Sequence, residues 1–200
     1  MASMNAEKTA VIIEVARKLR IKDPRWLDAM IMHESGYDPI IQNRGGHRAF
    51  GLIQFTPIAA TELHNKAPQL GISEPEDVPR LFPTFEAQMR GPVFWYYNLQ
   101  PKPYISLYEI AAATFYPKYR YSDPNKILDS AKAIAANPGI NTVGILRDRL
   151  QKLLDSPSLA TNKYHDEAYA IAGNPPSGIS PLLIAAIAAV GGWMILSHKS

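Results

Sequence analysis

The chain has 200 residues, 46% of them hydrophobic and 20% charged, so it can bury the core of one globular domain with some residues left over. Its formal net charge is +3 and its isoelectric point is near 9.0. This mild basic bias suits contact with cell wall, nucleic acid or lipid, but it does not choose among them. The absence of cysteine excludes disulfides, thiolate zinc sites and a cysteine nucleophile.

Helix signals run along most of the chain. The N-terminal segment intersperses charged with apolar residues, so we interpret it as an amphipathic helix and not as a secretory signal. Asp23, Thr56 and Asp123 each precede a proline, which is the order of an N-cap followed by proline at the first helical position. Capping boxes mark further helix starts at Ser73 and Ser106. We expect helices near 6–20, 24–35, 57–66, 74–81, 84–99, 107–116, 124–136 and 142–155, and a weaker one near 163–172.

No stretch alternates convincingly with a period of two, and we therefore predict an all-α fold with little sheet. The C-terminal segment "ISPLLIAAIAAVGGWMIL", residues 179–196, carries no charge. As a helix it would be about 27 Å long, close to the roughly 30 Å of a bilayer core. We predict a membrane-spanning anchor, and a helix buried in a core or against a partner is the alternative. The expected division is a globular domain (1–158), a linker (159–178) and a transmembrane anchor (179–196).

Glu34 stands at a position where a core residue is expected. The apolar stripe of the predicted helix 24–35 is formed by Leu27, Met30 and Ile31, and Glu34 is the next position on it. Gly36 is expected to end this helix, which puts Glu34 in the last turn. There the helix dipole and the apolar neighbours both raise the pKa of a carboxyl group. A carboxylic acid protonated near neutral pH suits general acid catalysis; the alternative is a glutamate that simply reaches solvent.

A glycine-rich segment follows Glu34. Gly45 and Gly46 allow a loop with unusual backbone dihedrals. Gly51 precedes "LIQF", in which Gln54 sets a polar amide among apolar residues. Such an amide can bond sugar hydroxyls or an acetamido group, and the alternative is an ordinary polar residue before a helix.

Three motifs now carry a family resemblance. "ESGYDP", "AFGLIQFTPIAA" and "LYEIAAATFYP" resemble, in this order and spacing, the motifs of the lytic transglycosylases with a goose-type lysozyme fold, above all those of bacteriophage virions. The resemblance covers about residues 20–135. It implies a lysozyme-like helical domain in which Glu34 is the sole acid and base, Ser35 supports the site, Gln54 lines the glycan cleft and Tyr116 lies near the acid. The family more often has Asn where Asp38 stands, and its cellular members differ from "FYPK" in the third motif.

Aromatic residues gather in the second half of the chain. Sugar rings stack on such side chains, and we expect Tyr119 and Tyr121, which charged residues flank, to lie in the cleft or at the surface. For Phe94, Trp95 and Phe115 we favour core packing.

The function that these features predict is cleavage of the β-1,4 bond between MurNAc and GlcNAc in peptidoglycan, with a 1,6-anhydromuramoyl product. A hydrolase usually needs a second carboxylate. Asp38 is expected to serve a turn, Asp77 and Glu86 give no sign of facing the cleft, and Asp123 is expected to be an N-cap. A hydrolytic muramidase on the same fold is the first alternative, and a non-catalytic, membrane-anchored glycan-binding virion protein is the second.

The histidines form no ligand-spaced pair, and no phosphate-binding or dinucleotide motif is present, so we predict neither a metal nor a cofactor. The expected partners are peptidoglycan glycan strands, a lipid membrane and other virion proteins, with no nucleic acid. The expected location is a membrane-anchored place in the virion, with action in the host periplasm.

Overall fold

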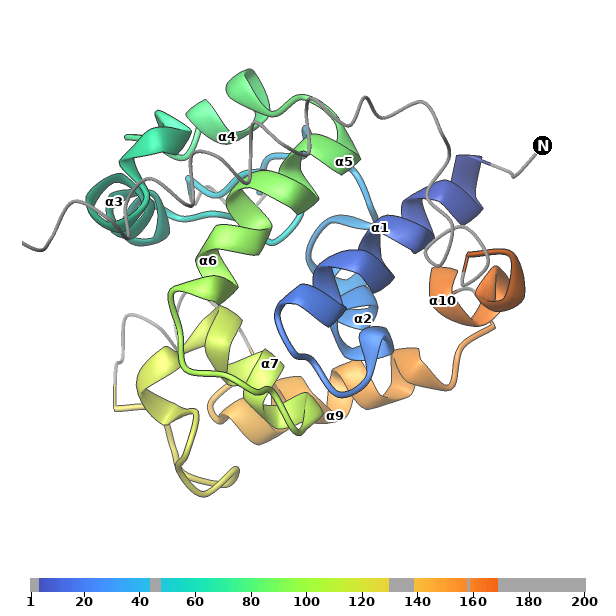
Figure 1. Ribbon diagram of the computed structural model, residues 1–200. Coiled ribbons are helices and arrows are strands. Elements are labelled where there is room, and N and C mark those ends of the chain that lie inside the picture. Colours follow the sequence, from blue (N-terminus) through green and yellow to red (C-terminus); the bar gives the residue numbers. More distant parts are fainter. Residues whose placement is uncertain (1–3, 44–47, 130–138, 158, 169–200) are drawn as a thin grey trace, which may run out of the picture.

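A computed structural model of the chain describes residues 4–43, 48–129, 139–157 and 159–168. Over these residues the chain is mostly helical and has isolated β-bridges but no strand, in agreement with the predicted all-α class (Figure 1). The α-helices are α1 (Met4–Lys18), α2 (Pro24–Ser35), α3 (Pro57–Lys66), α4 (Asp77–Leu81), α5 (Phe85–Gln88), α6 (Phe94–Asn98), α7 (Leu107–Phe115), α9 (Val143–Leu154) and α10 (Ala160–Lys163). Short 3-10 or π segments are η1 (Pro68–Leu70), η2 (Met89–Val93) and η3 (Pro117–Tyr119).

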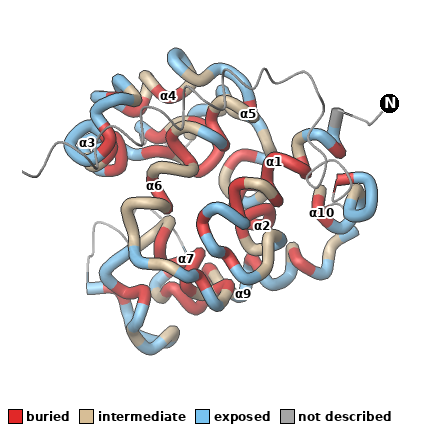
Figure 2. The backbone as a smooth tube through the Cα atoms, in the orientation of Figure 1, coloured by how far each residue is buried: buried red, intermediate tan, exposed pale blue. Residues whose placement is uncertain are grey.

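Helix α2 is the centre of the arrangement. It packs against α1, α7, α9 and α10, and α9 also runs along α7 (Figure 1). Helix α3 lies at the other side of the molecule, where α6 contacts it, and its outer face is exposed (Figure 2). The largest fully buried side chains include Tyr97, Tyr104 and Phe55, so aromatic residues form much of the core.

The sequence signals around α2 act as expected. Asp23 is the N-cap, and its carboxylate accepts a hydrogen bond of 3.0 Å from the backbone N–H of Arg25, while Pro24 is the first helical residue. Gly36 ends the helix in the left-handed conformation, with φ of 58°, and its N–H donates to the Met32 carbonyl. The helix therefore spans Pro24–Ser35, as predicted.

The expected single helix 84–99 is interrupted. Helix α5 ends at Gln88, the π segment η2 follows, and Gly91 has non-helical dihedrals of −96° and −109°. Pro92 explains the break, because it lacks an N–H and its ring crowds the preceding turn. The chain resumes as α6, which carries Tyr96 and Tyr97 into the core.

The expected helix 124–136 is wrong over residues 124–129, which form a turn and an extended stretch. Asp123 bonds the N–H of Asn125 in a local turn, and Ile127 makes an isolated bridge with Thr142. The carbonyl of Pro124 accepts from Gly144 at the start of α9, so long-range packing overrides the local cap signal. Residues 130–136 lie outside the described residues.

The packed region extends past residue 158, where we expected a linker to begin. Leu159 and Ala168 are fully buried, and the backbone N–H of Thr161 donates to Asp28 of α2 over 2.7 Å. Residues 165–168 are helical, within the expected helix 163–172. The apolar segment 179–196 lies outside the described residues, among which none of the helices is both long enough and apolar enough for a membrane span.

Candidate active site

Glu34 lies in the last turn of α2, on the face that the stripe predicts. Leu27, Met30 and Ile31 are fully buried, and Glu34 is half-buried at the end of this row. Its Oε1 atom is shielded from solvent and has no hydrogen-bond partner among the described residues. A buried carboxylate oxygen without a donor strongly favours the protonated form.

The surroundings of Glu34 raise its pKa to about 7, and burial is the cause. No charged group among the described residues contributes to this rise. The titratable neighbour is Tyr97 of α6, whose pKa is raised well above its ordinary value by burial, with a smaller contribution from the charge of Glu34. The Tyr97 hydroxyl lies 2.5 Å from Thr114 Oγ1, and Thr114 Oγ1 donates to the Ile110 carbonyl of α7. Thr114 thus joins Tyr97 of α6 to α7, and α7 packs against α2, the helix that carries Glu34.

His33 does not join this site. The residue is exposed, and its pKa is lowered by partial desolvation and then by the charge of Arg149 on α9. The side chain leaves α2 in a direction different from that of Glu34, as the helix period requires.

Two of the other carboxylates considered near the site, Asp38 and Asp77, have local partners. Asp38 Oδ1 accepts from the N–H of Ile40 over 2.9 Å, which is the turn that we expected. Asp77 accepts from the N–H of Ser73 over 2.8 Å and pairs with Arg80, so its pKa is lowered. Glu86 lies in α5, and no described contact connects it with Glu34.

Ser35 is buried, with 5% of its surface exposed, and its hydroxyl donates to the Ile31 carbonyl over 2.9 Å. The hydroxyl is therefore used in a hydrogen bond within its own helix, to a carbonyl four residues earlier. Ser35 therefore supports the end of α2, and in this structure it does not present its side chain to a ligand as a substrate-binding residue would.

Gln54 stands in a tightly closed turn. Its φ is 52°, which is rare for a residue with a side chain, and Gly51 in the same turn has φ of 78°. The Gln54 side-chain amide donates to the Gly51 carbonyl over 2.9 Å and to the Ile41 carbonyl over 3.4 Å. Gln54 thus holds the turn together through its nitrogen, and it is half-buried.

Gln88 of α5 is a residue that the sequence analysis missed. It is fully buried, its Oε1 accepts from the N–H of Leu52 over 2.9 Å, and its Nε2 donates to the carbonyls of Phe82 and Pro39. One side chain therefore ties the turn that carries Gln54 to the segment after α2. A glutamine between apolar neighbours gave no periodic signal, although a lone amide at a buried helix position is a recognisable hint of such a clamp.

The two predicted tyrosines of the third motif have different environments. Tyr116 is half-buried, and its ring meets the ring of Tyr119 edge-on at 5.9 Å. Tyr119 is only 3% exposed, and its hydroxyl accepts from the N–H of Asp129 over 2.8 Å. The expectation that Tyr119 lies in the cleft or at the surface is therefore wrong, because Tyr119, the last residue of η3, is buried with the hydrophobic core. Tyr121 is exposed, as predicted.

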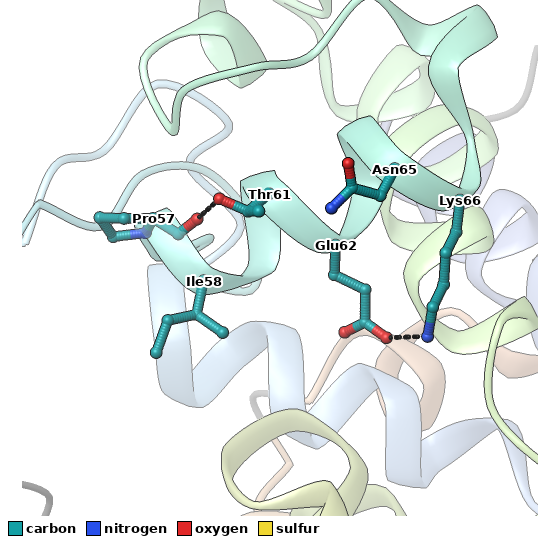
Figure 3. Close-up of a pocket in the computed structure, with 6 residues that line it drawn as sticks. All are labelled: Pro57, Ile58, Thr61, Glu62, Asn65 and Lys66. Atoms are coloured by element: carbon teal, nitrogen blue, oxygen red, sulfur yellow. Dashed lines mark hydrogen bonds and ion pairs between the residues drawn. The ribbon is translucent and has the colours of Figure 1, made fainter.

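A surface cavity of about 500 Å³ lies along α3, whose first residues, Pro57 to Ala60, end the second motif (Figure 3). It is lined by Pro57, Ile58, Thr61, Glu62, Asn65 and Lys66. Ile58 is 82% exposed, and Glu62 pairs with Lys66 over 2.8 Å. Burial raises the pKa of Tyr96 in α6, and the charge of Glu62, one of the lining residues, adds to this rise. Glu34 itself does not line this cavity.

Gly45 and Gly46, for which we expected a loop with unusual backbone dihedrals, lie outside the described residues. Comparisons of the chain with protein-family models, curated proteins and solved structures found no match. The functional conclusion therefore depends on the motifs and on the geometry around Glu34.

Proposed function

We propose that this protein is a peptidoglycan lytic transglycosylase with a lysozyme-like helical domain. The observation that carries the proposal is the state of Glu34, a half-buried carboxyl group with one shielded, unpaired oxygen and a pKa of about 7. At neutral pH such a group exists in both forms in similar amounts. It is suited to give a proton in one step and take one in the next.

In the proposed reaction Glu34 protonates the oxygen that joins MurNAc C1 to GlcNAc, and that C–O bond breaks. The 6-hydroxyl of the same MurNAc attacks C1, and its proton goes to the Glu34 carboxylate. The acid is restored, no water is consumed, and the product ends in a 1,6-anhydromuramoyl ring. Tethering of the nucleophile within the sugar replaces the positioning that a second carboxylate would give to water.

This route is supported by the lack of any described charged group that perturbs Glu34. Hydrolysis by two carboxylates requires a separation of about 5–5.5 Å or about 6.5–9.5 Å, and a carboxylate at the shorter distance from a buried acid would raise its pKa by repulsion. Asp38, the nearest in sequence, is engaged in its own turn.

The remaining parts of the proposal concern the substrate and the location. The exposed Ile58 and the polar Asn65, about two turns further along α3, line the same cavity and offer a face on which glycan can lie. We retain Gln54 and Tyr116 as substrate contacts, and we propose the segment 179–196 as a membrane anchor. Such an enzyme would open the cell wall for a virion during genome entry or lysis.

Zymography on purified cell walls tests the activity. Wild type should clear the wall, and Glu34→Gln should lose about 10²–10⁴-fold in rate, because an amide of nearly the same shape cannot deliver a proton. Glu86→Gln, the same change on a glutamate of α5, is the matched control and should keep full activity. A folded Glu34→Gln protein with more than about a tenth of wild-type activity would refute the assignment.

A further inference from the structure

The segment that follows residue 158 is joined to the helix that carries Glu34. The Tyr37 hydroxyl donates to Asp28 Oδ1 over 2.8 Å and accepts from the backbone N–H of Ala160 over 3.1 Å. Asp28 Oδ2 accepts from the backbone N–H of Thr161 over 2.7 Å. We refer to these four residues, Asp28, Tyr37, Ala160 and Thr161, as the latch.

The latch is buried at its centre. Asp28 has no exposed surface, although it is a carboxylate, and each of its two oxygens has a partner. Burial raises the pKa of Asp28, while the hydrogen bonds from Thr161 and Tyr37 favour the charged form. A carboxylate so placed is retained at a free-energy cost, so it marks a contact that must be made in one geometry.

The latch reaches the end of α2 through Tyr37. Asp28 lies about two turns before the end of α2, so the Tyr37 side chain must run back along the last turns of the helix to reach it. Tyr37 also has φ of 71°, directly after Gly36 with φ of 58°. A tyrosine in the left-handed region costs about 1–2 kcal/mol and persists only where its surroundings hold it. Here the two hydrogen bonds of the Tyr37 hydroxyl stabilise this conformation. The Tyr37 ring also packs on Phe85, with 6.4 Å between the ring centroids.

We propose that Tyr37 and Asp28 are positioning residues for Glu34: the latch fixes the turn at Gly36, directly after the last turn of α2, and thereby keeps the Glu34 carboxyl group in its shielded place. The inference deepens the proposed function, and it rests on that function only for the role of Glu34 in catalysis. It also makes the C-terminal part of the chain a structural element of the site, because Ala160 and Thr161 supply two of the donors.

The test is a titration of Glu34 in the full chain, followed by NMR of ¹³C-labelled glutamate carboxyl groups, with Glu34→Gln to assign the signal. Wild type should titrate near pH 7. Tyr37→Phe deletes the hydroxyl, loosens the turn and lets water reach Glu34. Its midpoint should therefore fall by about one pH unit, which is about a tenfold change in the ratio of acid to carboxylate at a given pH. Tyr97, whose pKa is affected by the charge of Glu34, is unchanged in this variant.

Tyr164→Phe is the matched control. It makes the same tyrosine-to-phenylalanine change within the segment that supplies Ala160 and Thr161, and it removes a bond outside the latch, from Asn5 Nδ2 to the Tyr164 hydroxyl over 3.0 Å. It should leave the midpoint of Glu34 at the wild-type value. If the segment acted only on overall stability, the titration midpoint of Glu34 would shift by the same amount in Tyr37→Phe and in Tyr164→Phe.

Ala160→Pro decides the outcome if Tyr37→Phe does not fold. Ala160 is the first residue of α10, where proline is tolerated, and Leu159 before it has the extended dihedrals of −63° and 130° that a following proline requires. This change removes the N–H that binds Tyr37 and little else, and it should lower the midpoint in the same direction. An unchanged midpoint in the folded variant would overturn the inference. A lowered midpoint in a protein that does not cleave cell wall would uphold the latch and reject the proposed function.

Discussion

Gly51 stands so close to Gln88 that a Cβ atom built on residue 51 would lie 2.6 Å from Gln88 Oε1. Gln88 cannot move aside cheaply, because it is fully buried and its Oε1 accepts from the N–H of Leu52. The turn that carries Gln54 therefore requires glycine at position 51, because there is no room for a Cβ atom beside Gln88. The φ of 78° at Gly51 imposes the same requirement on the backbone.

Gly51→Ala should destabilise the protein by about 2–4 kcal/mol, because the strained dihedral and the lost hydrogen bonds of Gln88 add up. Gly36→Ala is the control: its φ is also positive, but a Cβ there meets nothing within 4 Å, so about 1–2 kcal/mol is expected. Urea unfolding followed by circular dichroism measures both. Equal losses in the two variants would show that Gln88 does not hold this turn.

Arg120→Leu should cost about 3–5 kcal/mol in the free energy of unfolding. The Arg120 and Glu109 side chains are 2% and 11% exposed, and removal of the cation leaves Glu109 buried without a counter-charge. Arg120 also donates to the carbonyls of Pro101 and Pro103, so lysine should not restore stability.

Arg48→Leu is the comparison for this change. Its side chain is 54% exposed and pairs with Glu74 and Glu76 at the surface, so its loss should leave the unfolding midpoint nearly unchanged. Similar losses for the two arginines would contradict the structural role given to Arg120.

Glu34→Gln should stabilise the protein more at pH 8 than at pH 5. Burial raises the folded-state pKa of Glu34 to about 7 from an ordinary value of 4.5, so the folded state holds the proton more tightly than the unfolded chain. The stability that this proton contributes is present at low pH and is lost as the pH rises through 7. The amide does not titrate, and the variant should gain about 2 kcal/mol on wild type between the two pH values. If the stability difference between the variant and wild type were the same at pH 5 and pH 8, the folded-state pKa of Glu34 would not be raised.

The rate of wall cleavage should fall on the alkaline side of pH 7. The first step needs protonated Glu34, and the protonated fraction decreases about tenfold per pH unit above its pKa. A turbidity assay on cell walls between pH 5 and pH 9 measures this limb. A rate that stays constant up to pH 9 would exclude Glu34 as the acid.

Local signals predicted the element that carries the candidate acid. Asp23, Pro24 and Gly36 mark the two ends of α2, and the stripe through Leu27 places Glu34 at the border of the core. These features depend on contacts within one helix, so the residues themselves specify them.

Contacts between distant segments could not be predicted in this way. The Asp123–Pro124 pair has the same form as Asp23–Pro24, yet Pro124 bonds Gly144 of α9 and the helix does not start. Tyr119 is flanked by charged residues, but its side chain is buried and its hydroxyl accepts a hydrogen bond from the backbone N–H of Asp129. Gln88 acts on partners far from it in the sequence, among them Pro39. Tertiary partners override local preference at each of these positions.

The most direct measurement of the central claim is mass spectrometry of the products of peptidoglycan digestion in water enriched in ¹⁸O. Cleavage by Glu34 with the muramoyl 6-hydroxyl as nucleophile should give 1,6-anhydro ends that carry no ¹⁸O, and Glu34→Gln should give no products. Reducing ends heavier by one molecule of labelled water would contradict the account. That result would make the protein a muramidase and require a second acid beside Glu34, with Asp38 the first to be tested.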